Sequence, residues 1–382
     1  MKEMMRPMQL GGKEIIFGEG TLQHLSVIPA QRVTIVIGGS SVKKNGTLDA
    51  ITAILKQRQV PWNLIEGIDD EPLWSQVCQG ADLMHAFLPD LIVAVGGGSV
   101  MDGAKAMWVV YEHPELTELS QIVSAKPFPV LRTKARMCCI PTTSGTASEV
   151  SRSVVITDDE SGMKQGIGNM EMMPDYAICD PVLTLSMPPH ITASTGMDAL
   201  THAVEAYVSK RANIVADVLA EAAITMIVKW LPVAFENGDN MEARENMLVA
   251  SMIAGMSFTN VSLGITHSFS HTLGGHFHLP HGLLNAIILP YVIDFNRQDP
   301  EAAKRYDKLA QLCSADDFAQ LVRDLNQRLG IQARLHELIP DKERFDSLNR
   351  MMSDMTKADG CTKTNPIIPS VEAIGVLLEQ MY

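Results

Sequence analysis

The densest group of potential metal ligands lies between positions 264 and 282, which hold five of the chain's eleven histidines. Neutral imidazole is the commonest nitrogen ligand of zinc, iron, nickel and copper in proteins, so this segment predicts a mononuclear metal site. His267 and His271 are four residues apart and share one face if the segment is helical. A Gly-Gly pair and Pro280 interrupt the segment, so that His281 can approach from a different direction.

A carboxylate or a further imidazole should complete such a site, and Asp198 and His202 are the candidates. They are four residues apart, which places their β carbons about 5–6 Å from each other on a helix, close enough to share one ion. Their neighbours are apolar, so the helix is expected to be buried nearly all round. Because a buried carboxylate needs a partner, a metal ion at this position is physically reasonable.

The composition limits the kinds of partner. The 382 residues are 46% hydrophobic and 20% charged, which suffices for a large core and indicates two domains. A formal charge of −13 argues against nucleic acid and anionic membranes, both of which need a basic face. We expect neither a membrane-spanning helix nor an export signal. The six cysteines show neither the spacing of a disulfide framework nor that of a metal site. We therefore expect a cytoplasmic protein with free thiols and small-molecule partners.

The first half of the chain alternates apolar runs with amphipathic stretches. After an extended start at 13–17, strands are expected at 33–37, 62–68, 91–95 and 136–140, with helices at 47–58, 73–87 and 99–110. Such alternation is typical of a parallel sheet covered on both faces. Between 150 and 185, a polar turn at 157–162 joins two short extended runs and predicts a β-hairpin or a linker.

The second half reads as helical. Helices are expected at 193–210, 214–233, 241–259, 264–275, 282–295, 300–313, 318–329, 342–355 and 370–382. The chain is therefore expected to form an α/β domain at 1–188 and an all-helical domain at 189–382, the second of which carries all the candidate metal ligands.

Three glycines, at 96 to 98, stand directly between a predicted strand and a predicted helix. They let the backbone approach a phosphate closely, while the N–H groups of the first helical turn point at it. The pattern is neither the Gly-x-Gly-x-x-Gly fingerprint nor a nucleoside triphosphate loop, and the glycines could simply make a tight turn. Two further small-residue loops, at 38–41 and 141–149, stand at the C-terminal ends of predicted parallel strands, as a nucleotide crevice requires.

Together these motifs resemble the iron-containing, or group III, alcohol dehydrogenases. The resemblance rests on segments 96–105, 141–146 and 196–202 and on the spacing of His267, His271 and His281, and it extends essentially from Met8 to the end, including 361–366. It implies a dehydroquinate synthase-like fold with an N-terminal dinucleotide-binding α/β domain, a C-terminal helical domain, and a divalent metal in the cleft between them.

The resemblance also implies roles for single residues. It assigns the metal to Asp198, His202, His267 and His281, and it makes His271 a candidate for proton relay or substrate positioning. His276 and His278 match no ligand position. Iron is the metal that the resemblance implies, and zinc or another divalent ion stays open, because these ligands suit several metals.

For the cofactor, the resemblance implies contacts from loop residues of the first domain. The pyrophosphate and its ribose are expected near Gly97, Gly98, Ser99 and Asp102. Hydroxyl groups are expected from Thr142, Thr143 and Thr146, and Lys164 is expected to reach the nicotinamide-side ribose. Without the resemblance, a solvated turn lysine is the preferred interpretation of Lys164.

The loop at Gly38, Gly39 and Ser40 bears on the choice between NAD and NADP. NAD-preferring relatives often carry an aspartate at the position of Gly39, where it binds the ribose 2′-hydroxyl and repels a 2′-phosphate. Here the loop offers hydroxyls, N–H groups and two lysines, which predicts a preference for NADP(H) while NAD(H) stays possible. Another departure, at 69–72, leaves contacts to the adenine open.

The expected activity is a metal-dependent, NAD(P)-linked alcohol dehydrogenase or aldehyde reductase for a small neutral substrate, working as a homodimer or higher oligomer. The metal would polarise the substrate oxygen while hydride passes to or from the nicotinamide. Phe258 and Cys361 match positions near the family's substrate pocket, and a role as ordinary core residues is equally open. The alternatives are a dehydroquinate synthase-like lyase, which would need basic residues for its substrate, or a non-catalytic cofactor-binding protein.

Overall fold

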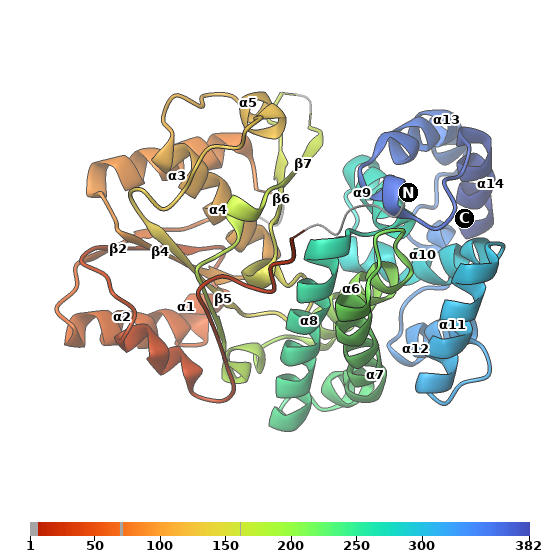
Figure 1. Ribbon diagram of the computed structural model, residues 1–382, viewed down its shortest axis with the longest axis horizontal. Helices are drawn as coiled ribbons and strands as arrows, with labels where there is room; N and C mark the ends of the chain where they lie inside the picture. Colours follow the sequence, from red (N-terminus) through yellow and green to blue (C-terminus); the bar gives the residue numbers. More distant parts are fainter. Residues whose placement is uncertain (1–6, 69–71, 161) are drawn as a thin grey trace. The chain divides into compact units, whose positions relative to one another are not determined.

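The computed structural model describes residues 7–68, 72–160 and 162–382 (Figure 1). The predictions for the extreme N-terminus and for 69–71 lie outside these residues. The chain forms two compact units, which are described separately: unit 1 comprises Met1–Thr142 and Ala147–Thr184, and unit 2 comprises Thr143–Thr146 and Leu185–Tyr382. The main boundary is at 184–185, where we expected 188, and the sequence did not indicate that 143–146 belong with the helices.

Unit 1 is built on a six-stranded parallel sheet of order β1-β8-β5-β4-β2-β3. The strands are β1 (Glu14–Phe17), β2 (Val33–Ile37), β3 (Trp62–Ile65), β4 (Leu91–Gly96), β5 (Arg136–Pro141) and β8 (Tyr176–Cys179). The helices of this unit are α1 (Ser41–Lys44), α2 (Thr47–Gln57), α3 (Trp74–Phe87), α4 (Gly98–Glu112) and α5 (Leu119–Ser124). The parallel sheet flanked by helices confirms the predicted fold class.

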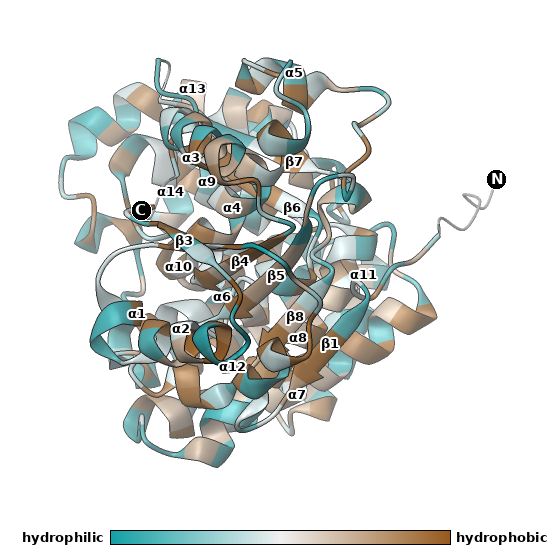
Figure 2. Cartoon of the chain, turned by 90° about the vertical axis from the view of Figure 1, so that its left-hand side faces the viewer, coloured by the Kyte–Doolittle hydropathy of each residue, from teal (hydrophilic) through white to brown (hydrophobic). Residues whose placement is uncertain are grey.

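Both faces of this sheet are covered, which explains its continuous apolar strands. Along β4, Ile92 and Ala94 face the core beneath α3 and α4, whereas Leu91, Val93 and Val95 face the core beneath α2. In Figure 1, α3 and α4 accordingly lie on one side of the sheet and α2 on the other. Figure 2 shows brown, hydrophobic segments in the middle of this sheet, around β4, β5 and β8.

The predicted hairpin is present as the antiparallel pair β6 (Ser153–Thr157) and β7 (Lys164–Gly168). We did not predict β8, which lies between β1 and β5. It is only four residues long and follows a short 3₁₀ turn at Met170–Met172, so it gives no periodic signal of its own. The short α1 and α5 were missed for the same reason.

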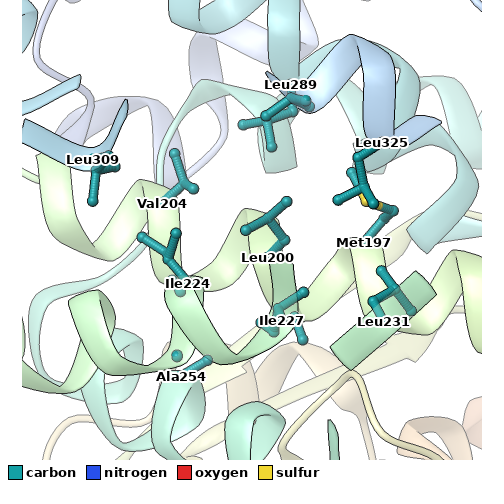
Figure 3. Packing of buried hydrophobic residues seen from close by; sticks show 14 of the residues in the cluster. Met197, Leu200, Val204, Ile224, Ile227, Leu231, Ala254, Leu289, Leu309 and Leu325 are labelled. Atoms are coloured by element: carbon teal, nitrogen blue, oxygen red, sulfur yellow. The ribbon is translucent and has the colours of Figure 1, made fainter. Parts of the chain in front are cut away.

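Unit 2 is helical throughout its long elements, as predicted. They are α6 (Pro189–Val208), α7 (Ile214–Glu236), α8 (Met241–Val261), α9 (Ile265–Phe277), α10 (His281–Asn296), α11 (Pro300–Leu312), α12 (Phe318–Arg328), α13 (Lys342–Ala358) and α14 (Val371–Met381). Figure 3 shows the core in which Leu200 of α6, Ile227 of α7 and Leu289 of α10 meet. Side-chain caps fix several helix starts, such as Asn213, which accepts hydrogen bonds from the first backbone N–H groups of α7.

Helix α7 contradicts one expectation from the sequence. Among the described residues, α7 is a helix that is long and apolar enough to cross a membrane. Helices α8 and α9 also satisfy these criteria of length and composition if they are taken together as one span bent by 101°. However, Ala220, Ile224, Ile227 and Leu231 of α7 are fully buried in the core of unit 2. A core helix passes a test of length and composition as easily as a membrane span does, so the finding is weak evidence for a membrane.

Candidate metal centre and dinucleotide site

Helix α6 brings Asp198 and His202 onto one buried face, as their spacing predicts. Every residue of this helix from Gly196 to Val208 is buried, and Asp198 is only 3% exposed. The distance from Asp198 Oδ1 to His202 Nε2 is 3.9 Å. The ring of His202 is held in place from its other side by Phe258 of α8, whose centroid lies 4.5 Å away in a stacked arrangement.

The other two candidate ligands come from α9 and α10. The Nε2 atoms of His267 and His281 lie 3.8 and 3.7 Å from Asp198 Oδ1. The start of α10 approaches α6 closely because residue 282 is glycine: a Cβ there would lie only 2.3 Å from the carbonyl oxygen of Ser194. Ligand atoms of Asp198, His267 and His281 all lie within 4.8 Å of one another, a spacing that one metal ion can bridge.

The hydrogen bonds of the ring nitrogens fix the tautomers of two of these histidines. His202 Nδ1 lies 3.2 Å from the carbonyl oxygen of Gly145, and His267 Nδ1 lies 2.6 Å from Glu205 Oε2. A carbonyl oxygen can only accept, so His202 carries its proton on Nδ1. Burial raises the pKa of Glu205 to about 7, against the hydrogen bonds from the N–H groups of Gly264 and Thr266. An ionised Glu205 can only accept, so with this carboxylate His267 also carries its proton on Nδ1.

His281 is fixed in a related way. Its Nδ1 lies 3.0 Å from Ser270 Oγ, and the same hydroxyl donates its proton to the carbonyl oxygen of His281, also at 3.0 Å. The hydroxyl oxygen is therefore left to accept from Nδ1–H. All three imidazoles thus turn an Nε2 lone pair toward one carboxylate oxygen, which is the arrangement that a metal ion needs.

The charges of the site agree with this arrangement. Burial lowers the pKa of His267 and of His281 well below the ordinary value, so both rings are neutral at neutral pH. Burial alone would raise the pKa of Asp198. In acid, where imidazoles take up protons, the attraction of the neighbouring rings and the hydrogen bond from Asn285 outweigh burial and hold this pKa below its ordinary value. One carboxylate and three imidazoles are an appropriate donor set for Fe(II), Zn(II) or a similar divalent ion.

Asn285, four residues after His281 on α10, lies among the same atoms. Its Nδ2 donates to Asp198 Oδ1 at 2.7 Å and is 3.1 Å from His281 Nε2 and 3.3 Å from His267 Nε2. Its buried Oδ1 has no hydrogen-bond partner among the described residues. A cluster of acceptor atoms served by a single amide, with an orphaned oxygen beside it, fits a site that is built for a cation.

His271 lies next to the cluster but is engaged differently. Its ring stacks on that of His281 at 5.3 Å, while its Nδ1 is 3.0 Å from Asp359 Oδ2. Asp359 in turn accepts from Ser268 Oγ at 2.9 Å and from the backbone N–H of Cys361 at 2.7 Å. Burial would raise the pKa of Asp359, but these hydrogen bonds hold it well below its ordinary value.

The remaining histidines of the segment lie apart from the three ligand nitrogens described above. His276 Nε2 contacts Met355 Sδ at 3.3 Å, and burial lowers the pKa of this ring. His278 ends α9 in a left-handed conformation with φ of 52°. Neither belongs to a potential metal-binding group among the described residues.

In unit 1, the loops predicted to bind the dinucleotide follow neighbouring parallel strands. Gly38, Gly39 and Ser40 follow β2, Gly97 and Ser99 lie where β4 meets α4, and Thr142 follows β5, so all stand at one edge of the sheet. The first residue after β5 is fixed to the end of β4 by a hydrogen bond from the N–H of Thr142 to the oxygen of Gly96 at 2.9 Å. Gly98 begins α4, whose first N–H groups can bind a phosphate.

Glycine is required where these loops pack tightly. A Cβ at Gly96 would lie 2.7 Å from a methyl group of Val100, and one at Gly38 would lie 2.9 Å from the same group. A Cβ at Gly39, in contrast, would meet nothing within 4 Å. The first two glycines are therefore structural, whereas a side chain is sterically permitted at position 39.

The other residues that were predicted to contact the cofactor are already engaged in hydrogen bonds, lie on the hairpin strand β7, or belong to unit 2. Both oxygens of Asp102 already accept hydrogen bonds inside unit 1, from Ser148 Oγ at 2.6 Å and from the N–H of Val155 at 2.9 Å. A ribose would have to share one of these oxygens. Lys164 begins β7 opposite Thr157, and Thr143 and Thr146 belong to the segment that packs with unit 2.

Three residues that the sequence reasoning missed support the candidate ligands: Glu205, Asn285 and Asp359. Two of them follow from helical spacing, since Glu205 lies seven residues after Asp198 and Asn285 lies four residues after His281. A polar residue on the ligand-bearing stripe of an otherwise apolar helix was the available signal. Asp359 is remote from its partner in the sequence and gave none.

Comparison with known proteins agrees with this arrangement. The family model described as iron-containing alcohol dehydrogenase matches residues 12–181, and that of the C-terminal part of the Fe-containing alcohol dehydrogenase family matches residues 192–382. An NADPH-dependent butanol dehydrogenase of Clostridium saccharobutylicum is 42% identical over 379 residues, covering 97% of this chain and 96% of the relative. The 1-propanol dehydrogenase PduQ of Citrobacter freundii is 36% identical over 375 residues, covering 95% and 96%.

Solved structures give the same result. An iron-containing alcohol dehydrogenase of Thermococcus thioreducens superposes with a TM-score of 0.91 at 36% identity, covering 99% of both chains. A 1,3-propanediol oxidoreductase superposes with a TM-score of 0.92 at 30% identity, covering 100% of both. The family models, the relatives and the structures together show that the chain belongs to the iron-containing alcohol dehydrogenase family.

Proposed function

We propose that this NAD(P)-linked alcohol dehydrogenase interconverts a short uncharged alcohol and its aldehyde or ketone, with NADP(H) as the preferred hydride carrier and Fe(II) as its metal. The convergence of three Nε2 atoms on Asp198 Oδ1, with every Nδ1 already bonded elsewhere, is the observation that carries this proposal. The names of the relatives, which act on butanol, 1-propanol and 1,3-propanediol, support a short substrate.

The proposed metal ligands are Asp198, His202, His267 and His281. Iron is the first choice because it is the metal of the family. Zinc is the second choice: such a site generally binds zinc more tightly than iron, so the ion that is loaded depends on which metal is supplied. When bound, the ion supplies a Lewis acid for the substrate oxygen and the dinucleotide supplies or accepts the hydride. The protein must therefore hold neutral imidazoles, exclude competing ligands and move one proton.

His271 is the proposed carrier of that proton. Asp359 holds Nδ1 at 3.0 Å and leaves Nε2 for a substrate hydroxyl or water. The ring is about one quarter exposed, with 28% of its side-chain surface accessible, so it can exchange protons with solvent. Its stacking on His281 places it beside the proposed ligands without making it one of them.

The preference for NADP(H) rests on the loop after β2. No carboxylate stands at Gly39, and the exposed residues that follow it include Ser40, Ser41 and Lys44. Lys43 already forms an ion pair with Glu66, which lessens its availability for a phosphate. The 42% identical relative is described as NADPH-dependent, which supports the same choice.

The test is anaerobic purification followed by elemental analysis and a screen of NADPH and NADH oxidation with C2 to C5 aldehydes. We expect close to one divalent ion per chain and faster oxidation of NADPH. A metal-loaded protein that oxidises neither coenzyme with any of these aldehydes would contradict the proposed substrate class. A higher catalytic efficiency with NADH would contradict only the coenzyme preference.

We further propose that the enzyme works in the cytoplasm as a homodimer or higher oligomer. The edge strand β1 carries Phe17, which is 57% exposed, and could extend the sheet through a second copy. Light scattering coupled to size exclusion would test this, and a monomeric mass at micromolar concentration would contradict it.

A further inference from the structure

Glu205 is a fully buried carboxylate whose three hydrogen bonds all concern one candidate ligand and the helix that carries it. It is 2% exposed and lies on α6, three residues after His202. Its Oε2 accepts from His267 Nδ1 at 2.6 Å and from the N–H of Gly264 at 2.9 Å. Its Oε1 accepts from the N–H of Thr266 at 2.7 Å.

The local structure is shaped around this carboxylate. Helix α9 has no side-chain cap from its own N-cap residue, which is Gly264. A Cβ at Gly264 would lie 2.8 Å from Glu205 Oε1 and from Asn365 Oδ1, so a larger residue would displace these two acceptors. Asn365 accepts from the N–H of Ile265 at 3.2 Å. The first N–H groups of α9 are thus capped by distant side chains.

We propose that Glu205 is a positioning residue of the metal centre, which fixes His267 as its Nδ1–H tautomer and holds the first turn of α9 against α6. This inference deepens the proposed function and rests on it. Because one helix carries Asp198, His202 and Glu205, the ligand His267 is held by the same rigid element that supplies two further ligands. A carboxylate behind a ligating imidazole also makes the other ring nitrogen a stronger donor.

The isosteric variant Glu205→Gln tests the inference. Its amide keeps one acceptor but turns an NH₂ group toward N–H donors, so His267 loses its fixed tautomer while the side-chain volume stays the same. We expect Zn²⁺ affinity, measured by competition with a chromophoric chelator, to fall about 10- to 100-fold.

Glu112→Gln is the matched control. Glu112 is a buried glutamate of unit 1 that likewise accepts from consecutive backbone N–H groups, those of Thr133, Lys134 and Ala135. Its loss removes a comparable carboxylate without touching a candidate ligand, so Zn²⁺ affinity should equal that of the wild type. A similar fall in both variants would show a general structural effect and overturn the inference.

A second measurement needs no variant. Long-range ¹H–¹⁵N correlation spectra of the metal-free wild type should show His267 protonated on Nδ1, and a proton on Nε2 would overturn the inference even if Glu205→Gln does not fold. A wild type that binds no Zn²⁺ would refute the proposed function itself. A wild type that binds Zn²⁺ no better than a folded Glu205→Gln would refute only the role of Glu205.

Discussion

Replacing Asp198 with asparagine should abolish most of the stabilisation that a metal ion gives the protein. The carboxylate is the shared partner of three Nε2 atoms at 3.7–3.9 Å, and asparagine keeps its shape while removing its charge. Removing a unit charge beside a divalent ion in a buried site costs on the order of several kcal/mol of binding, so at least a hundredfold loss of affinity is expected.

This loss converts into a thermal shift. At a free metal concentration of 100 times the wild-type Kd, binding stabilises the folded protein by about 2.7 kcal/mol, and a hundredfold weaker site would give only about 0.4 kcal/mol. For a unit of about 200 residues, the first value corresponds to a Tm increase of roughly 5–11 °C and the second to less than about 2 °C.

The assay is thermal unfolding with and without Zn²⁺, because the difference between the two Tm values of each protein isolates metal binding from any effect of the substitution on the metal-free fold. Asp180→Asn is the control: this buried carboxylate of unit 1 accepts from the N–H groups of Gly20 and Leu22, so its loss should lower Tm equally with and without metal. An undiminished Zn²⁺ increment in Asp198→Asn would refute the ligand set.

Three further outcomes are expected. His271→Gln should lower kcat roughly a hundredfold while leaving the bound metal per chain unchanged, and an equal loss of metal would show that His271 is a ligand instead. Gly39→Asp should repel the 2′-phosphate of NADPH and shift the NADPH-to-NADH ratio of kcat/KM toward NADH by about 10- to 100-fold. The uncharged control Gly39→Asn should shift this ratio little. Equal effects of the two substitutions would show that discrimination at this position is steric and not electrostatic. Burial raises the pKa of Glu149 to about 7, so between about pH 4.5 and pH 7 the folded protein binds a proton that the unfolded chain has released, and the unfolding free energy falls as pH rises through this range. In urea unfolding, Glu149→Gln should lack up to about 3 kcal/mol of this decrease. Parallel pH profiles of the variant and the wild type would contradict this prediction.

Most of the architecture could be predicted from the sequence because the hydrophobic residues of the two halves follow different periodicities. Continuous apolar runs such as Leu91–Gly96 predicted buried parallel strands, and long 3.6-residue patterns predicted the helices of unit 2. The short strand β8 was missed because its pairing with β1 and β5, and not a local pattern, determines it. Helix α5 was missed because six residues are too few to show a helical period. The membership of Thr143–Thr146 in unit 2 is likewise a property of tertiary packing.

The candidate ligands were predictable for a different reason. His267, His271 and His281 crowd into one segment, and Asp198 with His202 shows helical spacing in an apolar setting. The supporting residues Glu205 and Asn285 act through contacts between helices, and Asp359 reaches His271 from 88 residues away. The helical spacing of Glu205 and Asn285 from the candidate ligands was a signal in the sequence, whereas the contact of Asp359 is visible only in the fold.

The arrangement on α6 restricts how this chain can change its length. Each residue inserted into a helix rotates everything beyond it by about 100°, so a single insertion between Asp198 and Glu205 would turn either the carboxylate or its companions away from α9 and α10. A segment that joins two helices, such as 313–317 between α11 and α12, has no helical phase to preserve. Descendants of this protein should therefore differ in length there, while the seven-residue interval on α6 stays fixed.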